Sequence, residues 1–208
     1  DLGEARHRKS RRNGEVSRRD RSGCQEPIGQ ETALLGNDYP IAVQNAGLVL
    51  LGPFLYTLFN RLDMLTDDGD GSAHFVGIEG ASRAVHLLQY LVDTRLDAPA
   101  EALPLNKLLC GLSPDAPVWP SLTPAQADLD VCDQLLEAVL GQWQSIGHSS
   151  VPVLRESFLQ RGGSLSPDGG KWNLTVQKLS FDILLDRIPW QFSVIAGSWM
   201  PKPLHVTW

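Results

Sequence analysis

The spacing of apolar residues changes along this chain, and that change limits the folds open to it. From Leu48 to Leu62 and again from Leu129 to Trp143, apolar residues recur every three or four positions, which is typical of helices. From Trp172 to Val176 they alternate with polar residues, which indicates a strand. The sequence therefore predicts the α+β class, with a mostly helical N-terminal two-thirds and a small antiparallel β-sheet at the C-terminus.

Local signals place the expected elements along the chain. Pro53 should kink or restart the first helix, and Thr123 should cap the clearest helix, which runs up to Gly147. A further helix is expected from Ser150 to the Gly162-Gly163 pair. Residues 192–195 and 204–208 should form two more short strands. The last of these is expected at an edge of the sheet, because the prolines next to it cannot donate to a ladder.

The first 40 residues differ from the rest in composition. They are rich in Arg, Gly, Ser and Gln, so they cannot bury enough apolar surface to fold. We expect residues 1–40 to be a disordered basic arm or linker, followed by one α+β domain at residues 41–208. Residues 1–22 hold eight Lys or Arg and four Asp or Glu, although the whole chain has a formal net charge of -6. The acidic remainder disfavours nucleic acid as a ligand, and no aromatic residue stands among the arm's basic ones to stack on bases.

The cysteine spacing and the hydropathy of the chain indicate in which cellular compartment it folds and whether it enters a membrane. The three cysteines have no CxxC spacing, which favours a reducing compartment, so we expect a cytoplasmic protein that assembles within a larger particle. The apolar stretch Ile41–Phe59 is interrupted by Gln44, Asn45 and Gly52-Pro53, which predicts a buried helix and no membrane insertion. An initiator Met and a secretory signal are both lacking, so we expect a fragment of a longer chain.

No arrangement of residues in the sequence favours catalysis. The loop 67–71 carries three Asp residues but lacks the ligand register of a calcium-binding loop. The histidines have no zinc-site spacing, and neither a GxSxG elbow nor a phosphate-binding glycine loop occurs. Cys110 and His86 are the remaining nucleophile and base candidates, and a buried cysteine and a hydrogen-bonded core histidine are the simpler interpretation. We therefore predict that the chain is not an enzyme and uses no metal and no cofactor.

Several stretches of the folded part resemble one family, the C-terminal domain of tape measure proteins from contractile, phage-tail-like injection systems. These stretches are Asn45–Leu51 with Pro53–Leu55, Ala84–Leu91, Leu103–Gly111, Leu154–Arg161, Phe181–Trp190 and Trp199–Trp208. Residues 1–40 lie outside the resemblance.

The resemblance implies a structural assembly component of the injection particle. Such a protein helps to set tube length through an extended ruler region and anchors that ruler to tube, hub or baseplate proteins. A homo-oligomer is compatible with this role, and the alternative is an adaptor or protein-binding module without a ruler function. A forty-residue arm reaches about 60 Å as a helix at about 1.5 Å per residue, so we expect most of the ruler to precede Asp1.

Two groups of residues in the matched stretches are candidate functional residues. Polar residues set among leucines should form a structural network, with Asp182 or Asp186 paired to an arginine at the junction of helices and sheet, because unpaired buried charge is costly. This group comprises Asn106, Arg155, Glu156, Asp182, Asp186 and Arg187. The second group should either fill the core, which we favour, or bind a partner. It comprises Trp190, Trp199, Met200, Leu204, Val206 and Trp208.

Overall fold

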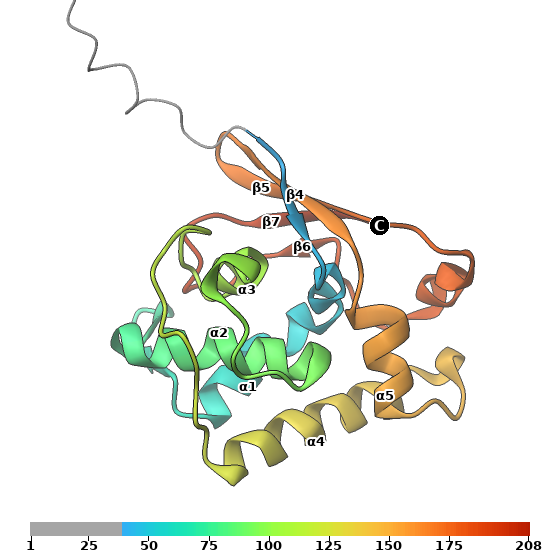
Figure 1. Cartoon of the computed structure of the whole chain (residues 1–208), viewed down its shortest axis with the longest axis horizontal. Helices are drawn as coiled ribbons and strands as arrows, with labels where there is room; N and C mark the ends of the chain where they lie inside the picture. Colours follow the sequence, from blue (N-terminus) through green and yellow to red (C-terminus); the bar gives the residue numbers. More distant parts are fainter. Residues whose placement is uncertain (1–38) are drawn as a thin grey trace, which may run out of the picture. The chain divides into compact units, whose positions relative to one another are not determined.

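A mixed five-stranded sheet, with helices gathered on one of its faces, forms the described part of the chain (Figure 1). The computed structural model describes residues 39–208, so the disordered arm expected at residues 1–40 falls almost wholly outside the described residues. The strands stand in the order β1-β4-β5-β7-β6. Their bounds are Ile41–Val43 for β1, Gly163–Asp168 for β4, Lys171–Val176 for β5, Val194–Ile195 for β6 and Leu204–Thr207 for β7.

The prediction of helices first and a small antiparallel sheet last is wrong. Strand β1 lies at the beginning of the described chain and pairs antiparallel with β4, while β5 and β7 pair in parallel. A second sheet, β2 (Leu65–Asp67) with β3 (Ala73–Phe75), lies in the part expected to be helical. These early strands have three residues each, which is too short to show an alternating pattern.

Strand β7 lies inside the sheet and not at its edge, so the predicted edge position is also wrong. It pairs with β5 on one side and with β6 on the other. Pro201 and Pro203 both precede Leu204, so their missing N–H groups do not interrupt the ladder of β7. The long connection from β5, which includes β6, gives the chain room to return in the same direction, as parallel pairing requires.

The helices enclose a single core. They are η1 (Ala46–Phe54), α1 (Leu55–Arg61), α2 (Gly77–Asp93), η2 (Ala100–Ala102), α3 (Pro104–Leu109), α4 (Gln126–Gln142), η3 (Gln144–Ile146), α5 (Val151–Leu154), η4 (Arg155–Leu159) and η5 (Ser180–Arg187). Four of the η segments are 3₁₀ helices, and η4 is a π-helix.

Local geometry departs from the predicted helices in two places and agrees with them in a third. Helix α4 begins after Ala125 without a side-chain cap, so Thr123 does not cap it. The helix expected from Ser150 is a single α turn, α5, that continues as the π-helix η4. Pro53 lies near the end of the 3₁₀ helix η1, and the α-helix α1 begins two residues later at Leu55, so the predicted restart of the helix at Pro53 is confirmed.

The 3₁₀ helix η1 is deeply buried over its first six residues, Ala46–Leu51. Its backbone touches that of η4: a Cβ at Gly47 would overlap the carbonyl oxygen of Phe158 and would lie 2.6 Å from Cα of Leu159. The N–H of Ala46 donates to the carbonyl of Arg161 at 2.9 Å. A glycine at position 47 is therefore what allows the two backbones to meet.

Aromatic and polar side chains complete the core. The ring of Trp143 is fully buried and meets Phe158 edge to face at 4.8 Å between centroids, which joins the end of α4 to η4. His86 is fully buried in α2, and its Nε2 lies 2.7 Å from the carbonyl oxygen of Trp119. The prediction of a hydrogen-bonded core histidine at this position is therefore confirmed.

The backbone contact at Gly47 gives a first prediction. Gly47→Ala should lower the free energy of unfolding by at least about 3 kcal/mol, because the new methyl group must push η1 away from η4. Gly141→Ala is the matched control, since a Cβ there meets nothing within 4 Å. This control should stabilise α4 by up to about 1 kcal/mol. Urea unfolding measures both, and a Gly47→Ala protein as stable as the wild type would show that the two backbones do not touch.

Candidate functional site

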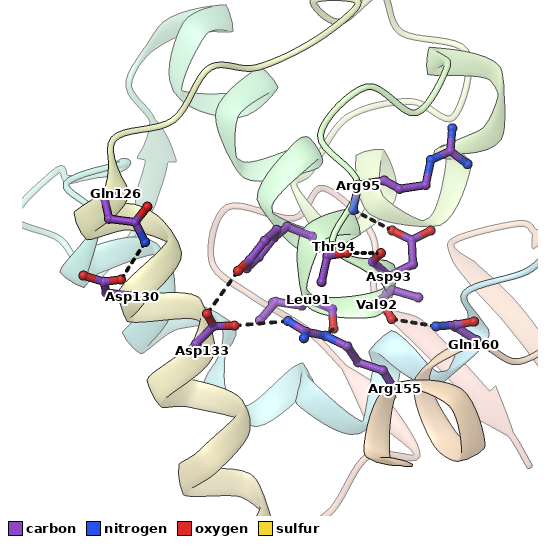
Figure 2. A network of polar contacts seen from close by, with 11 residues as sticks. Leu91, Val92, Asp93, Thr94, Arg95, Gln126, Asp130, Asp133, Arg155 and Gln160 are labelled. Atoms are coloured by element: carbon purple, nitrogen blue, oxygen red, sulfur yellow. Dashed lines mark hydrogen bonds and ion pairs between the residues drawn. The ribbon is translucent and has the colours of Figure 1, made fainter. Parts of the chain in front are cut away.

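Arg155 joins three helices at the end of α2 (Figure 2). It stands at the first position of η4, and its Nε donates to the carbonyl of Leu91 at 3.1 Å. Its Nη2 donates to Oδ1 of Asp133 on α4, also at 3.1 Å. The guanidinium therefore satisfies a carbonyl in the last turn of α2 and pairs with a carboxylate of α4 at the same time.

A tyrosine completes this arrangement. The hydroxyl of Tyr90 donates to the other oxygen of Asp133 at 3.0 Å, and the guanidinium of Arg155 lies 5.4 Å from the centre of the tyrosine ring. Burial raises the pKa of Tyr90, and the neighbouring carboxylate of Asp133 raises it further. The phenol therefore stays a donor, which keeps Asp133 in place beside Arg155.

The π-helix places a second side chain on the end of α2. The N–H of Gln160 donates to the carbonyl of Arg155, which closes a five-residue turn at 2.8 Å. This wide turn directs Nε2 of Gln160 to the carbonyl of Val92 at 3.1 Å, as Figure 2 shows. Two terminal carbonyls of α2 thus accept hydrogen bonds from side chains of one short segment. The helix itself ends at Thr94, which has a left-handed conformation with φ of 66°.

A second polar cluster lies around Arg161, which follows η4. The Arg161 side chain is 2% exposed, and its guanidinium contacts both oxygens of Asp182 in η5. It also donates to the carbonyls of Ser157 at 2.7 Å and Gln177 at 3.0 Å. The ring of Phe181 lies 4.8 Å from the guanidinium carbon. The buried cation is therefore paired, hydrogen-bonded and covered by an aromatic face.

Asp182 connects this cluster to the last residue of the chain. Its Oδ2 accepts hydrogen bonds from the N–H of Leu179 at 2.7 Å and from the indole N–H of Trp208 at 3.0 Å. Burial raises the pKa of Asp182, but the hydrogen bonds from Arg161, Leu179 and Trp208 favour the ionised form and outweigh burial. The pKa therefore lies below its ordinary value.

The three tryptophans of the C-terminal segment each bond to another part of the fold. The indole N–H of Trp190 donates to the carbonyl of Leu50 in η1, and that of Trp199 donates to the carbonyl of Leu109 in α3, both at 2.9 Å. Leu204 is fully buried in β7, and Met200 and Val206 are partly buried against the core. All six residues of the predicted strand group thus contact the body of the domain.

The predicted polar residues are divided among separate places. Asn106 lies in a buried cluster with Asn45 and Gln89, away from Arg155 and Asp182. Arg155 and Asp182 themselves belong to the two clusters described above. Glu156, Asp186 and Arg187 are exposed.

Sequence reasoning missed the partners of these residues. Asp133 and Arg161 complete the two ion pairs, and Asn45 and Gln89 complete the buried cluster of Asn106. Arg161 was detectable as a lone cation next to the glycine pair that ends the predicted helix. Asp133 carried no signal, because α4 has several acidic residues on its exposed side.

Other candidate chemistry takes ordinary structural roles in residues 39–208. Asp67 and Asp70 accept hydrogen bonds from backbone N–H groups of their own turn, at 2.8 and 2.9 Å. Burial raises the pKa of the Cys110 thiol well above its usual range and raises the pKa of Cys132 to about 12, so neither thiol ionises readily. Among the described residues, no group of three His, Cys, Asp or Glu side chains is placed to hold a metal ion.

Comparison with known proteins identifies one family. A family model described as contractile injection system tape measure protein matches residues 3–208. The match therefore includes most of residues 1–40, which the sequence analysis had placed outside the resemblance. Searches of curated proteins and of solved structures gave no match. Within residues 39–208, no helix is both long enough and apolar enough to cross a membrane.

The Arg161 cluster gives a second prediction. Arg161→Met should lower the free energy of unfolding by about 3–5 kcal/mol, because Asp182 would keep its partly buried charge without a cation. Arg187→Met is the matched control, since Arg187 is exposed on the same segment as Asp182. It should change stability by no more than about 0.5 kcal/mol. Chemical denaturation compares the two, and equal stabilities would show that the Arg161 cluster does not hold η5.

The lowered pKa of Asp182 gives a third prediction. Ionised Asp182 stabilises the fold above the ordinary aspartate pKa of about 3.9, and this contribution is lost as the pH falls through the lower folded-state pKa. The stability difference between wild type and Asp182→Asn should thus be largest near neutral pH and should shrink in acid. Thermal melts at a series of pH values measure it, with exposed Asp186→Asn following the wild type throughout. A difference that does not vary with pH would contradict this role.

Proposed function

The chain belongs to the family of contractile injection system tape measure proteins, and we propose that it helps to set the length of the particle's tube. The observation that carries this proposal is the family match itself, which extends over residues 3–208. The family is a structural one, so the chain's contribution is to bind, hold and space other components. A catalytic role has no support from the clusters described above, and we propose that the chain is not an enzyme.

We further propose that residues 41–208 form the domain that anchors the ruler to tube, hub or baseplate proteins. A domain that holds a ruler must resist separation of its own segments under load. The described chain enters this domain at β1, which pairs antiparallel with β4. The hydrogen bonds between the two strands are perpendicular to the direction of a pull along β1. A pull along β1 would load all of these hydrogen bonds at the same time, and this resists separation of the strands better than breaking the bonds one after another. The bond from Ala46 to Arg161 adds a further tie next to β1.

The polar clusters support anchoring by fixing the elements around β1. Arg155 connects α2, η4 and α4, while Arg161 and Asp182 connect η4 to η5 and to the C-terminal Trp208. We propose that the buried Arg161–Asp182 pair selects one arrangement of these elements, whatever its net contribution to stability. We propose that this network keeps the binding faces of the domain in a fixed geometry and that residues 1–40 act as a basic spacer that binds no nucleic acid.

The ruler proposal has a direct test in the producing strain, which is the fourth prediction. An insertion of forty helix-forming residues between residues 38 and 39 should lengthen the tube by about 60 Å, at about 1.5 Å per helical residue. The same insertion at the exposed turn Gly169-Gly170 between β4 and β5 is the matched control, since it adds residues without adding length between the two ends of a ruler. Cryo-electron microscopy of purified particles measures both tubes.

Two outcomes separate the ruler from an adaptor. Longer tubes for the first insertion alone support the ruler. Tubes of unchanged length, in particles that still contain the inserted protein, contradict it and leave an adaptor that binds particle components without measuring them. A pull-down of tube, hub and baseplate proteins with the full chain tests the anchoring role separately from tube length.

A further inference from the structure

Residues 112–124 lie between α3 and α4 and contain neither helix nor strand (Figure 1). We call this segment the strap. Its backbone is nevertheless bound to the fold near both ends. Lys107, a buried residue of α3, donates to the carbonyl of Pro114 at 3.1 Å, and the N–H of Leu122 donates to the carbonyl of Leu96, also at 3.1 Å. The strap is therefore a fixed loop on a rigid scaffold, which is where binding residues are commonly found.

The middle of the strap is held at Trp119. Its N–H donates to Oγ of Ser82 at 3.3 Å, and its carbonyl oxygen lies 2.7 Å from Nε2 of His86, one turn further along α2. Because a carbonyl can only accept, Nε2 of His86 carries the proton and donates. Ser82 and His86 are both fully buried, whereas the Trp119 side chain is 41% exposed. Two buried side chains of α2 thus fix the backbone of a residue whose indole reaches the surface.

Two prolines restrict the backbone around Trp119. A proline ring fixes its own φ at about −65°, and it confines the residue before it to extended conformations. Pro117 and Pro120 therefore restrict both themselves and the residues that precede them, Ala116 and Trp119. The structure has no turn or helix at residues 116–119. This part of the strap is thus an extended segment, and its restrictions favour polyproline II geometry.

The exposure of these residues agrees with that geometry. A polyproline II segment has three residues per turn, so residues three apart share one face. Pro117 and Pro120 have this spacing and both are exposed, while Val118 between them is partly buried against the core. The strap thus keeps one side on the domain and presents a Pro-x-x-Pro face, with Trp119, on the outside. Segments of this kind bind grooves lined by aromatic side chains, and tryptophan is among the residues that contribute most to binding.

We propose that the strap binds an aromatic-lined groove of another particle protein, with Pro117 and Pro120 between aromatic rings and Trp119 packed beside them. Asp115 is the one charged residue of the strap and is exposed, so the groove carries a lysine or arginine at the end next to Pro117. The buried side chains of α2 and α3 have already ordered the strap, so binding costs little further conformational entropy. This inference rests on the proposed anchoring function and specifies its surface.

Binding of the full chain to purified tube, hub and baseplate proteins of its particle, each added singly, tests the strap. For a protein that binds the wild type, Trp119→Ala should weaken binding by at least about tenfold, and so should Pro117→Ala combined with Pro120→Ala. Both variants should keep the melting temperature of the wild type, because these side chains are exposed. Asp115→Asn should weaken binding more in low salt than in high salt. Pro152→Ala is the matched control, since Pro152 is exposed outside the strap, and it should bind as the wild type does.

Fluorine NMR of the wild-type chain labelled with 5-fluorotryptophan gives a second arm that needs no altered strap. The Trp119 signal, assigned with Trp119→Phe, should shift when the binding protein is added, and the signal of fully buried Trp143 should not. A Trp119 signal that does not move on binding overturns the proposal. A Trp119 signal that moves with the concentration of the chain alone assigns the strap to a second copy of this chain and overturns it as well.

The outcomes also separate this surface from the anchoring function. If a particle protein binds the wild type and the strap variants equally, anchoring stands and the strap proposal is overturned. If none of the particle proteins binds the wild type, anchoring fails and the strap proposal fails with it. Neither result affects the ruler, because the ruler is judged by tube length.

Discussion

The burial of residues 46–51 in η1 imposes the arrangement of the other elements. Residues 46–51 have no polar side chain, so the only polar groups of this segment are those of its backbone, and buried backbone groups need partners. Some of these partners come from far along the chain: the carbonyl of Arg161 accepts from Ala46, and the indole of Trp190 donates to Leu50. The first helical segment is therefore complete only when the C-terminal third has folded around it.

This dependence explains which parts of the fold the sequence could reveal. Helices α2 and α4 and strand β5 show their own periodicity, because each buries one face along many residues. Strand β1 has three residues and continues into an apolar run, so nothing local distinguishes it from the start of a helix. The parallel position of β7 depends on the path of residues 177–203, and the π-helix depends on the packing of η1 against it. Neither is encoded in a local pattern.

The same reasoning applies to the polar clusters. Two of their charged members, Arg155 and Asp182, were visible in the sequence as polar residues among leucines, whereas their partners Asp133 and Arg161 were missed. Their grouping was not visible, because Arg155 contacts α2 and α4 while Asp182 contacts the residue after η4 and the C-terminal tryptophan. Neutral amides were harder still to recognise. Asn45 and Gln89 carry no charge to signal burial, and their importance lies in the direction of their hydrogen bonds, which only the positions of Val85 and Asp93 determine.

Two of these clusters, those of Arg155 and Asn45, meet at the C-terminal end of α2, and this has a mechanical consequence. Gln160 and Arg155 bind the last carbonyls of this helix, and Asp93 and Gln89 begin the amide chain that reaches Asn45 and then Asn106 in α3. Hydrogen bonds therefore connect the N-cap of η1 to α2 and α3, and Arg155 extends the connection to α4. Movement of any one of these elements is therefore opposed by hydrogen bonds to the others. A buried amide network fixes several elements at once, whereas a surface ion pair connects only two side chains and contributes little.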